Sequence, residues 1–255
     1  MFRNFCNVIF ALFLREIQSR FGSKKLGYFW AIFEPFAFIA VFAFIRSSVF
    51  NTQINGVNNA VFITISFLSF LLFRNIVKKA LDAFDANSAL FFYSAVKPIH
   101  TVITRILIEL FITLILYIIL CCIGWFFMIN VIPDNVYLLL LSTFWLIWFS
   151  FSLGLLFAII GTFYENFKRT IELVLAPLMF VSAVFYSVDG MTPTFRDILL
   201  YNPLVHLMEM FRASYFSVMS LKYVDFLYLG FWTLVPCYLS LYIYIKAHKK
   251  IRAYV

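Results

Sequence analysis

Long apolar runs separated by short polar segments make up most of the chain. A helix needs about 20 apolar residues to cross the hydrocarbon layer of a bilayer, which is roughly 30 Å thick. About six runs approach or exceed that length, so the pattern predicts an all-α polytopic membrane protein in which residues 1–255 form a single transmembrane domain. The predicted spans are residues 29–49, 59–73, 103–128, 136–164, 171–188 and 226–245.

Composition agrees with a lipid environment. Hydrophobic residues make up 64% of the chain, charged residues make up only 13%, and the mean hydropathy is +0.96. A water-soluble core cannot absorb that much apolar surface. The net charge of +8 comes from short basic clusters between apolar runs, where anionic lipid headgroups are the expected partner. No nucleic-acid partner is expected.

The basic residues also orient the chain. Of its 20 Lys and Arg residues, 16 fall on one side of the predicted spans, and only Arg46, Arg196, Arg212 and Lys222 fall on the other. Short loops rich in Lys and Arg remain in the cytoplasm. Both termini are therefore expected to be cytoplasmic. Residues 28–188 then hold the first five spans, and residues 246–255 form a cytoplasmic tail.

Residues 1–27 precede the first span and are predicted to form an interfacial helix. Between residues 2 and 21, apolar side chains recur at helical spacing, while polar side chains point elsewhere. This pattern suits a helix that lies in the plane of the cytoplasmic leaflet. A frayed basic tail is the alternative. The apolar face comprises Phe2, Phe5, Ile9, Phe13 and Ile17.

Residues 74–100 form the largest predicted cytoplasmic insertion. Asn87 and Ser88 are predicted to cap a short apolar helix over residues 89–96, which Lys97 and Pro98 end. An apolar helix flanked by charge suits docking in the groove of a partner protein; a helix that lies on the lipid surface is the alternative. The candidate contact residues are Asn87, Ser88, Leu90, Phe91, Tyr93 and Lys97.

Residues 189–225 form an outer segment that is neither a clean span nor a polar loop. Thr192 and Asn202 each precede a proline, which predicts two short helices over residues 194–201 and 204–217. These helices can re-enter the membrane only where protein or water covers their ends. An outer re-entrant gate is favoured over a pair of surface helices. His206, Glu209 and Arg212 are expected on the polar side of the second helix.

Sequence motifs for catalysis or nucleotide binding are absent. The chain contains neither G-x-x-x-x-G-K-[ST] nor H-E-x-x-H nor G-x-S-x-G, and its four cysteines lack the spacing of a zinc site. We therefore expect no catalytic residue, no metal and no cofactor in this chain. If ATP drives it, another chain hydrolyses the ATP.

Some of the many aromatic residues are candidates for the wall of a transport path. A sugar ring exposes apolar C–H faces, so aromatic side chains would let a polysaccharide slide across shallow contacts. The codon preference of an AT-rich genome is the alternative explanation for most of the 35 phenylalanines. The candidates for the path are Trp145, Trp148, Phe185 and Tyr186.

Several stretches resemble the permeases of polysaccharide-exporting ABC transporters. Residues 20–35, RFGSKKLGYFWAIFEP, resemble the entry to the first span in that superfamily. Residues 93–100, YSAVKPIH, residues 185–187, FYS, and residues 200–212, LYNPLVHLMEMFR, look most like the branch that exports capsular polysaccharide. The match runs through the whole chain.

The resemblance implies a homodimer with a twelve-span channel in the bacterial inner membrane. Two separate ATPase subunits would dock beneath it and bind ATP and Mg, and a lipid-linked capsular polysaccharide would be the substrate. The resemblance also implies that residues 89–96 belong to the ATPase-coupling region and that residues 189–217 contain the outer re-entrant helices. A periplasmic co-polymerase and an outer-membrane exporter are expected partners by analogy.

The sequence also allows other functions. A permease for O-antigen or teichoic acid shares the architecture and differs in polymer and anchor lipid. A membrane-embedded glycosyl- or acyltransferase would act without a partner, and a secondary transporter would use a proton gradient in place of ATP.

Overall fold

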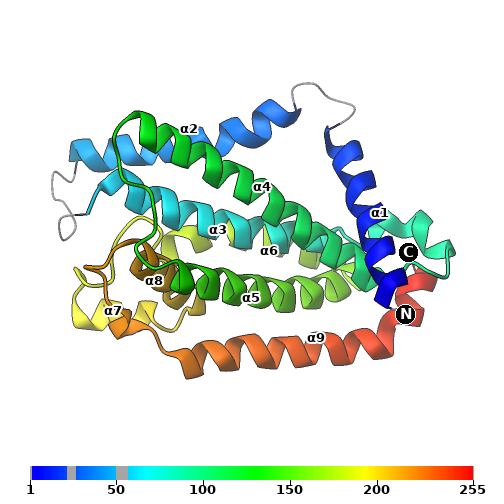
Figure 1. The fold of residues 1–255 in the computed structure, drawn as a ribbon. Coiled ribbons are helices and arrows are strands. Elements are labelled where there is room, and N and C mark those ends of the chain that lie inside the picture. Colours follow the sequence, from blue (N-terminus) through cyan, green and yellow to red (C-terminus); the bar gives the residue numbers. More distant parts are fainter. Residues whose placement is uncertain (1, 22–26, 50–56, 255) are drawn as a thin grey trace.

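A computed structural model describes residues 2–21, 27–49 and 57–254 as a bundle of helices (Figure 1). No strand occurs in these three ranges. The helices are α1 (Phe2–Phe21), α2 (Gly27–Val49), α3 (Asn59–Leu81), η1 (Asp85–Phe92), α4 (Pro98–Phe126), α5 (Val136–Phe163), α6 (Glu165–Val181), α7 (Pro193–Leu199), α8 (Pro203–Tyr215), η2 (Leu221–Tyr223) and α9 (Phe226–Tyr254); η1 and η2 are 3₁₀-helices.

Four of the described helices are long and apolar enough to span a membrane. They are Asn59–Leu81, Pro98–Phe126, Val136–Phe163 and Phe226–Arg252, and Phe33–Phe42 is a shorter apolar stretch within α2. These helices confirm the apolar runs at four of the predicted spans. The remaining two predicted spans coincide with α2 and α6.

Three helices differ in their ends from the predicted spans. The second predicted span ends at residue 73, and α3 continues beyond it to Leu81, where Lys78 and Lys79 are compatible with the helix dipole. α4 begins at Pro98, before the expected residue 103, since proline fits the first helical position. α6 ends at Val181, so residues 182–188 form a turn instead of the end of a span.

α3 is the central helix of the bundle. In its apolar stretch 83% of the residues are buried, against 22% for α4 and 17% for α9. α2, α4, α5, α6 and α8 all contact α3. The exposed faces of α4 and α9 carry large apolar side chains such as Leu114 and Leu234, which suits helices that face lipid.

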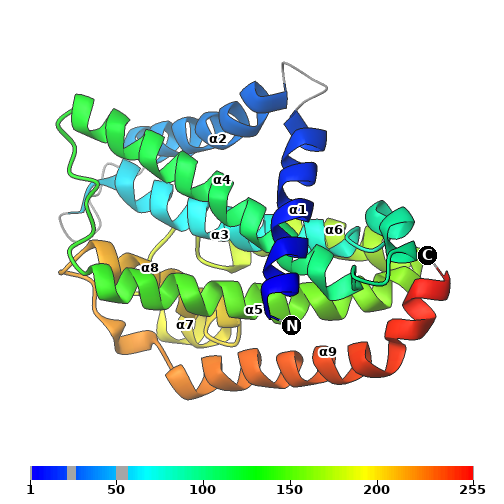
Figure 2. The ribbon, with the colours of Figure 1, turned by 45° about the vertical axis from the view of Figure 1, so that its right-hand side comes forward.

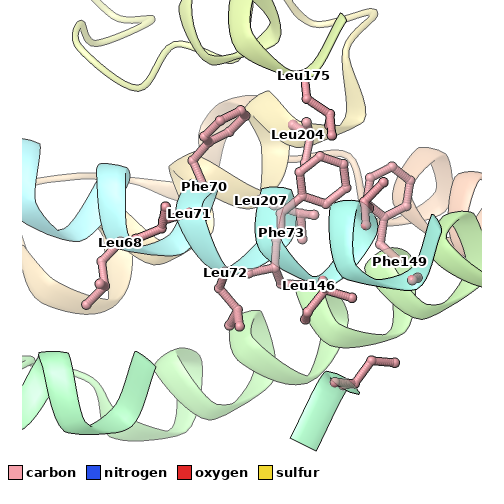
Figure 3. Packing of buried hydrophobic residues seen from close by; sticks show 14 of the residues in the cluster. Leu68, Phe70, Leu71, Leu72, Phe73, Leu146, Phe149, Leu175, Leu204 and Leu207 are labelled. Atoms are coloured by element: carbon pink, nitrogen blue, oxygen red, sulfur yellow. The ribbon is translucent and has the colours of Figure 1, made fainter. Parts of the chain in front are cut away.

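Aromatic and branched side chains fill the core around α3 (Figure 3). The rings of Phe73 on α3 and Phe149 on α5 stack with their centroids 5.6 Å apart. Leu175 of α6 and Leu204 of α8 approach the same part of α3 (Figure 3). Because lipid is as apolar as these side chains, close packing holds the helices together more than release from water does.

The two ends of the bundle differ in content. α7 and α8 gather at one end, and η1, the start of α1 and the end of α9 gather at the other (Figure 1). α1 crosses the long helices near this second end in both views (Figures 1 and 2). The helix predicted from the apolar pattern of residues 2–21 is therefore confirmed. It runs across the long helices rather than parallel to them (Figures 1 and 2).

Gly154 provides a test of the α3–α5 contact. A Cβ at this position would lie 3.0 Å from the Cβ of Ala80, whereas a Cβ at Gly230 of α9 would have no neighbour within 4 Å. We expect Gly154→Val to lower the free energy of unfolding by about 1–3 kcal/mol through overpacking, and Gly230→Val to change it little. Thermal unfolding in detergent measures both. Equal midpoints for the two variants would contradict the close packing of α3 on α5.

Candidate functional site

η1 lies at the end of the bundle that carries the termini (Figure 1). The prediction that Asn87 and Ser88 cap a helix over residues 89–96 is wrong: the helix is Asp85–Phe92, and Phe84 at its start makes no side-chain cap. Asn87 is buried inside it because its side chain has other partners. Its Nδ2 donates to Ala83 O (2.9 Å), and its Oδ1 accepts from Arg15 of α1 (2.6 Å). Lys97 does not end this helix but stands at the N-cap of α4.

The aromatic residues of this segment divide into buried and exposed ones. Phe91 is only 7% exposed and packs edge-on against Phe84, with ring centroids 6.5 Å apart. Phe92 is 93% exposed and Tyr93 is 66% exposed. The predicted contact residue Phe91 therefore belongs to the core, and Leu90 and Ser88 are half-buried. Phe92, which sequence reasoning missed, presents the large apolar ring.

Ion pairs attach η1 and its neighbours to the rest of this end. Lys168 of α6 pairs with Asp85 of η1 and lies 3.9 Å from Asp82. Glu16 of α1 lies 3.1 Å from Arg105 of α4, and Arg105 also donates to the carbonyl of Lys79. The contacts of Lys168 thus join η1 to α6, and those of Arg105 join α4 to α1 and α3.

The second site lies at the opposite end, on α7 and α8. Both helices begin with a proline, as predicted, and Asn202 Oδ1 accepts from the Leu204 N–H (3.0 Å). They end at Leu199 and Tyr215, slightly before the expected residues 201 and 217. The expected polar side of α8 is not exposed. His206, Glu209 and Arg212 are at most 3% exposed, so α8 is buried on every side.

Arg212 connects three parts of the molecule. Its Nη1 donates to Glu209 Oε1 (2.6 Å) within α8, and its Nε donates to Ser66 Oγ of α3 (2.9 Å). Its Nη2 donates to the carbonyls of Ala183 and Val184 in the turn after α6. The guanidinium also lies 4.3 Å from the ring centre of Phe62. A buried charge is tolerated only when it is paired and hydrogen-bonded in this way.

Ala183 adopts an unusual backbone conformation beside this guanidinium. Its φ is 56°, in the left-handed region that non-glycine residues rarely occupy. Such a conformation persists only where the surroundings fix it. The bonds from Arg212 to the carbonyls of Ala183 and Val184, in the turn that follows α6, supply that constraint.

His206 joins α8 to the start of α9. Its Nδ1 accepts the backbone N–H of Asp225 (3.1 Å), so the proton of the neutral ring lies on Nε2, which donates to Leu200 O (2.9 Å). Both ring nitrogens are therefore occupied within the protein. The geometry gives His206 a structural role in this conformation.

The four aromatic residues expected along a transport path lie in two separate places. Trp145 approaches Phe226 of α9 (6.1 Å between ring centroids), and the Trp148 Nε1 donates to Cys237 Sγ of α9 (3.5 Å). Phe185 instead stacks on Phe42 of α2 (4.2 Å). Tyr186 donates its hydroxyl proton to Phe180 O (2.7 Å).

Within the described ranges, no group of three or more His, Cys, Asp or Glu side chains could hold a metal ion. The two sites contain ion pairs, helix caps and exposed aromatic rings. Together with the apolar helices, this arrangement defines a polytopic α-helical membrane protein.

Comparison with known proteins identifies the family. Residues 7–216 match the model of the ABC-2 type transporter family, and the chain belongs to this family. It is 34% identical to the polysialic acid transport protein KpsM of Escherichia coli over 92% of this chain and 91% of that protein. It is 31% identical to the capsule polysaccharide export inner-membrane protein BexB of Haemophilus influenzae over 86% of this chain and 84% of that one. It is 27% identical to the capsule polysaccharide export inner-membrane protein CtrC of Neisseria meningitidis serogroup B, over 93% and 88%.

The buried pair on α8 makes a stability prediction. Arg212→Gln leaves Glu209 buried without its cation, and breaking such a pair costs about 3–5 kcal/mol. The double variant Glu209→Gln, Arg212→Gln removes both charges, so we expect it to be more stable than Arg212→Gln alone. Arg169→Gln is the control, because Arg169 and its partner Glu165 are exposed and such pairs contribute about 0–1 kcal/mol.

Thermal unfolding of the purified variants measures these differences. If Arg212→Gln unfolds at the same temperature as Arg169→Gln, the buried pair does not hold α8 in the way described.

Proposed function

We propose that the chain is the membrane-spanning permease subunit of an ATP-driven exporter that moves lipid-linked capsular polysaccharide across the bacterial inner membrane. The similarity to KpsM carries the proposal, because it extends over 92% of this chain and 91% of that protein. The similarity to BexB and CtrC, both capsule export proteins by name, supports the same substrate class. The chain is then a transport subunit rather than an enzyme.

In the proposed topology, α2, α3, α4, α5, α6 and α9 are six spans and both termini are cytoplasmic. The excess of Lys and Arg in the segments at one side supports this orientation. The start of α1 and the end of α9 lie at the same end of the bundle (Figure 1), as two cytoplasmic termini would. The crosswise course of α1 supports an in-plane helix at the cytoplasmic leaflet.

α7 and α8 are proposed to be the outer re-entrant helices. A re-entrant segment needs its polar groups satisfied by protein. Asn202 at the start of α8 and the partners of Arg212 meet that need. In this proposal His206, Glu209 and Arg212 support the outer gate from within the core, holding α8 against α3 and α9, and do not line the path themselves.

Two copies are proposed to form the channel. Trp145 and Trp148 lie against α9 and Phe185 lies against α2, so these residues do not form one wall within a single copy. If they contact the polymer, different parts of its path are involved. A periplasmic co-polymerase and an outer-membrane exporter would continue that path in a Gram-negative cell.

The ATPase subunits, which would bind ATP and Mg, are proposed to dock at η1. The support is the exposed pair Phe92 and Tyr93, followed by the exposed Lys97. Aromatic side chains are enriched at the core of protein–protein interfaces. The ion pairs of Lys168 and Arg105 would pass the motion of the ATPase to α6 and α4.

Phe92 allows a direct test of ATPase docking. We expect Phe92→Asp to abolish co-purification of the ATPase and export of polymer, because a charge would replace the most exposed ring of η1. The yield of inserted permease should stay unchanged. Phe127→Asp is the matched control: Phe127 is also exposed (65%) but lies past the end of α4 at the opposite end of the bundle. Undiminished ATPase binding by Phe92→Asp would refute the docking site.

Deletion of the gene in its encapsulated host tests the function. Polymer should accumulate in the cytoplasm, and the intact copy should restore surface capsule. Normal surface capsule would contradict the proposal, and a simultaneous loss of O-antigen or teichoic acid would identify the other polymer class.

A further inference from the structure

A pocket of about 390 Å³ opens at the end of the bundle that carries α7 and α8. It lies between α7, the start of α8, η2 and the start of α9. The sequence did not indicate that these four elements form a site together. Its lining includes three tyrosines, two carboxylates and a lysine: Tyr201, Tyr223, Tyr228, Asp197, Asp225 and Lys222.

The tyrosine walls of this pocket are held in place by bonds within the protein. Tyr223 accepts a hydrogen bond from Arg196 Nη1 (3.2 Å), and the same guanidinium lies 5.0 Å from its ring centre. Tyr228 donates its hydroxyl proton to Tyr201 O (2.6 Å), and its ring lies 5.3 Å from that of His206. A pocket with fixed walls loses little entropy when a ligand binds.

The groups available to a ligand are one aromatic face, two carboxylates and one ammonium group. Tyr201 is 77% exposed, although its backbone carbonyl is engaged with Tyr228. Asp197, Lys222 and Asp225 are exposed. Asp225 uses Oδ1 to cap α9 through the N–H groups of residues 227 and 228 (2.9 and 3.0 Å), and its carboxylate has a second oxygen.

This combination fits a sugar better than other ligands. A pyranose ring has an apolar C–H face that packs on a tyrosine ring, and its hydroxyls can donate to carboxylates and accept from an ammonium group. A phosphate group would meet two carboxylates, Asp197 and Asp225, against the one ammonium group of Lys222. An acyl chain would displace water from these carboxylates and from Lys222 without replacing the hydrogen bonds that the water made.

We propose that this pocket is a saccharide subsite at the outer mouth of the permease. One sugar unit of the emerging polymer stacks on Tyr201, and its hydroxyl groups bond to Asp197, Asp225 and Lys222. The inference rests on the proposed export function. It adds Tyr201 as a residue that contacts the polymer.

Binding to the purified permease–ATPase complex tests the subsite. The probe is a lipid-free oligosaccharide fragment of the host's capsular polymer, titrated by calorimetry. We expect Tyr201→Ala to raise the Kd about tenfold, the equivalent of one stacked ring, and Tyr201→Phe to bind like the unaltered protein. Tyr137→Ala is the matched control, since Tyr137 is 87% exposed at the same end of the bundle but outside the pocket.

Three outcomes would overturn the subsite. They are an unchanged Kd for Tyr201→Ala, an equal loss in Tyr137→Ala, and binding only of polymer that keeps its lipid anchor, which would point to recognition of the headgroup. The gene deletion separates this failure from that of the proposed function. If deletion abolishes surface capsule while Tyr201→Ala binds normally, only the subsite is wrong; if deletion leaves capsule intact, the export function is wrong.

Discussion

The fully buried guanidinium of Arg212 sets the main constraint on the end of the bundle that carries α7 and α8. Lipid offers no hydrogen bonds, so every donor of this group needs a partner within the chain. The partners come from α8 itself, from α3 and from the turn after α6. The packing of α8 on α3 and the left-handed backbone at Ala183 bring these acceptors to the donors of Arg212. His206 then extends the constraint to the start of α9.

The opposite end of the bundle is built differently. Lys168 of α6 pairs with Asp85 of η1, and this contact is partly exposed, whereas the pair of Glu16 and Arg105 is buried. Exposed pairs contribute little to stability, so the contacts of Lys168 can rearrange at lower cost than the buried α8 network. In the proposed function, the ATPase acts at the end that carries η1 and the gate lies at the end that carries α8. α3, buried along most of its length, connects the two ends.

Local signals in the sequence predicted local features well. Apolar runs identified the four long helices, and the Asn202–Pro203 pair identified the start of α8, because a cap and a proline act within a few residues. Helix ends that depend on distant partners were missed. Asn87 looked like a cap, but its partner Arg15 lies 72 residues away. Polarity placed Arg212 on the polar side of α8, and that side is buried, with Ser66 and Glu209 as partners of Arg212.

At the candidate sites, too, the sequence predicted local features and missed those that depend on distant residues. The sequence located the segment around η1, yet it could not tell which of the adjacent residues Phe91 and Phe92 faces outward, since both are apolar. The pocket at Tyr201 joins residues from four elements and has no sequence signature. Tertiary packing determines both the exposure of Phe92 and the pocket at Tyr201. It depends on residues far apart in the sequence, so local residue patterns do not reveal it.

Reconstitution tests the central claim most directly. The purified permease and its ATPase would be placed in proteoliposomes, and lipid-linked polymer that becomes protected from added glycosidase would be measured with and without ATP. Protection that requires both ATP and the ATPase subunit is the expected result. Transport by the permease alone, driven by a proton gradient, would contradict the account.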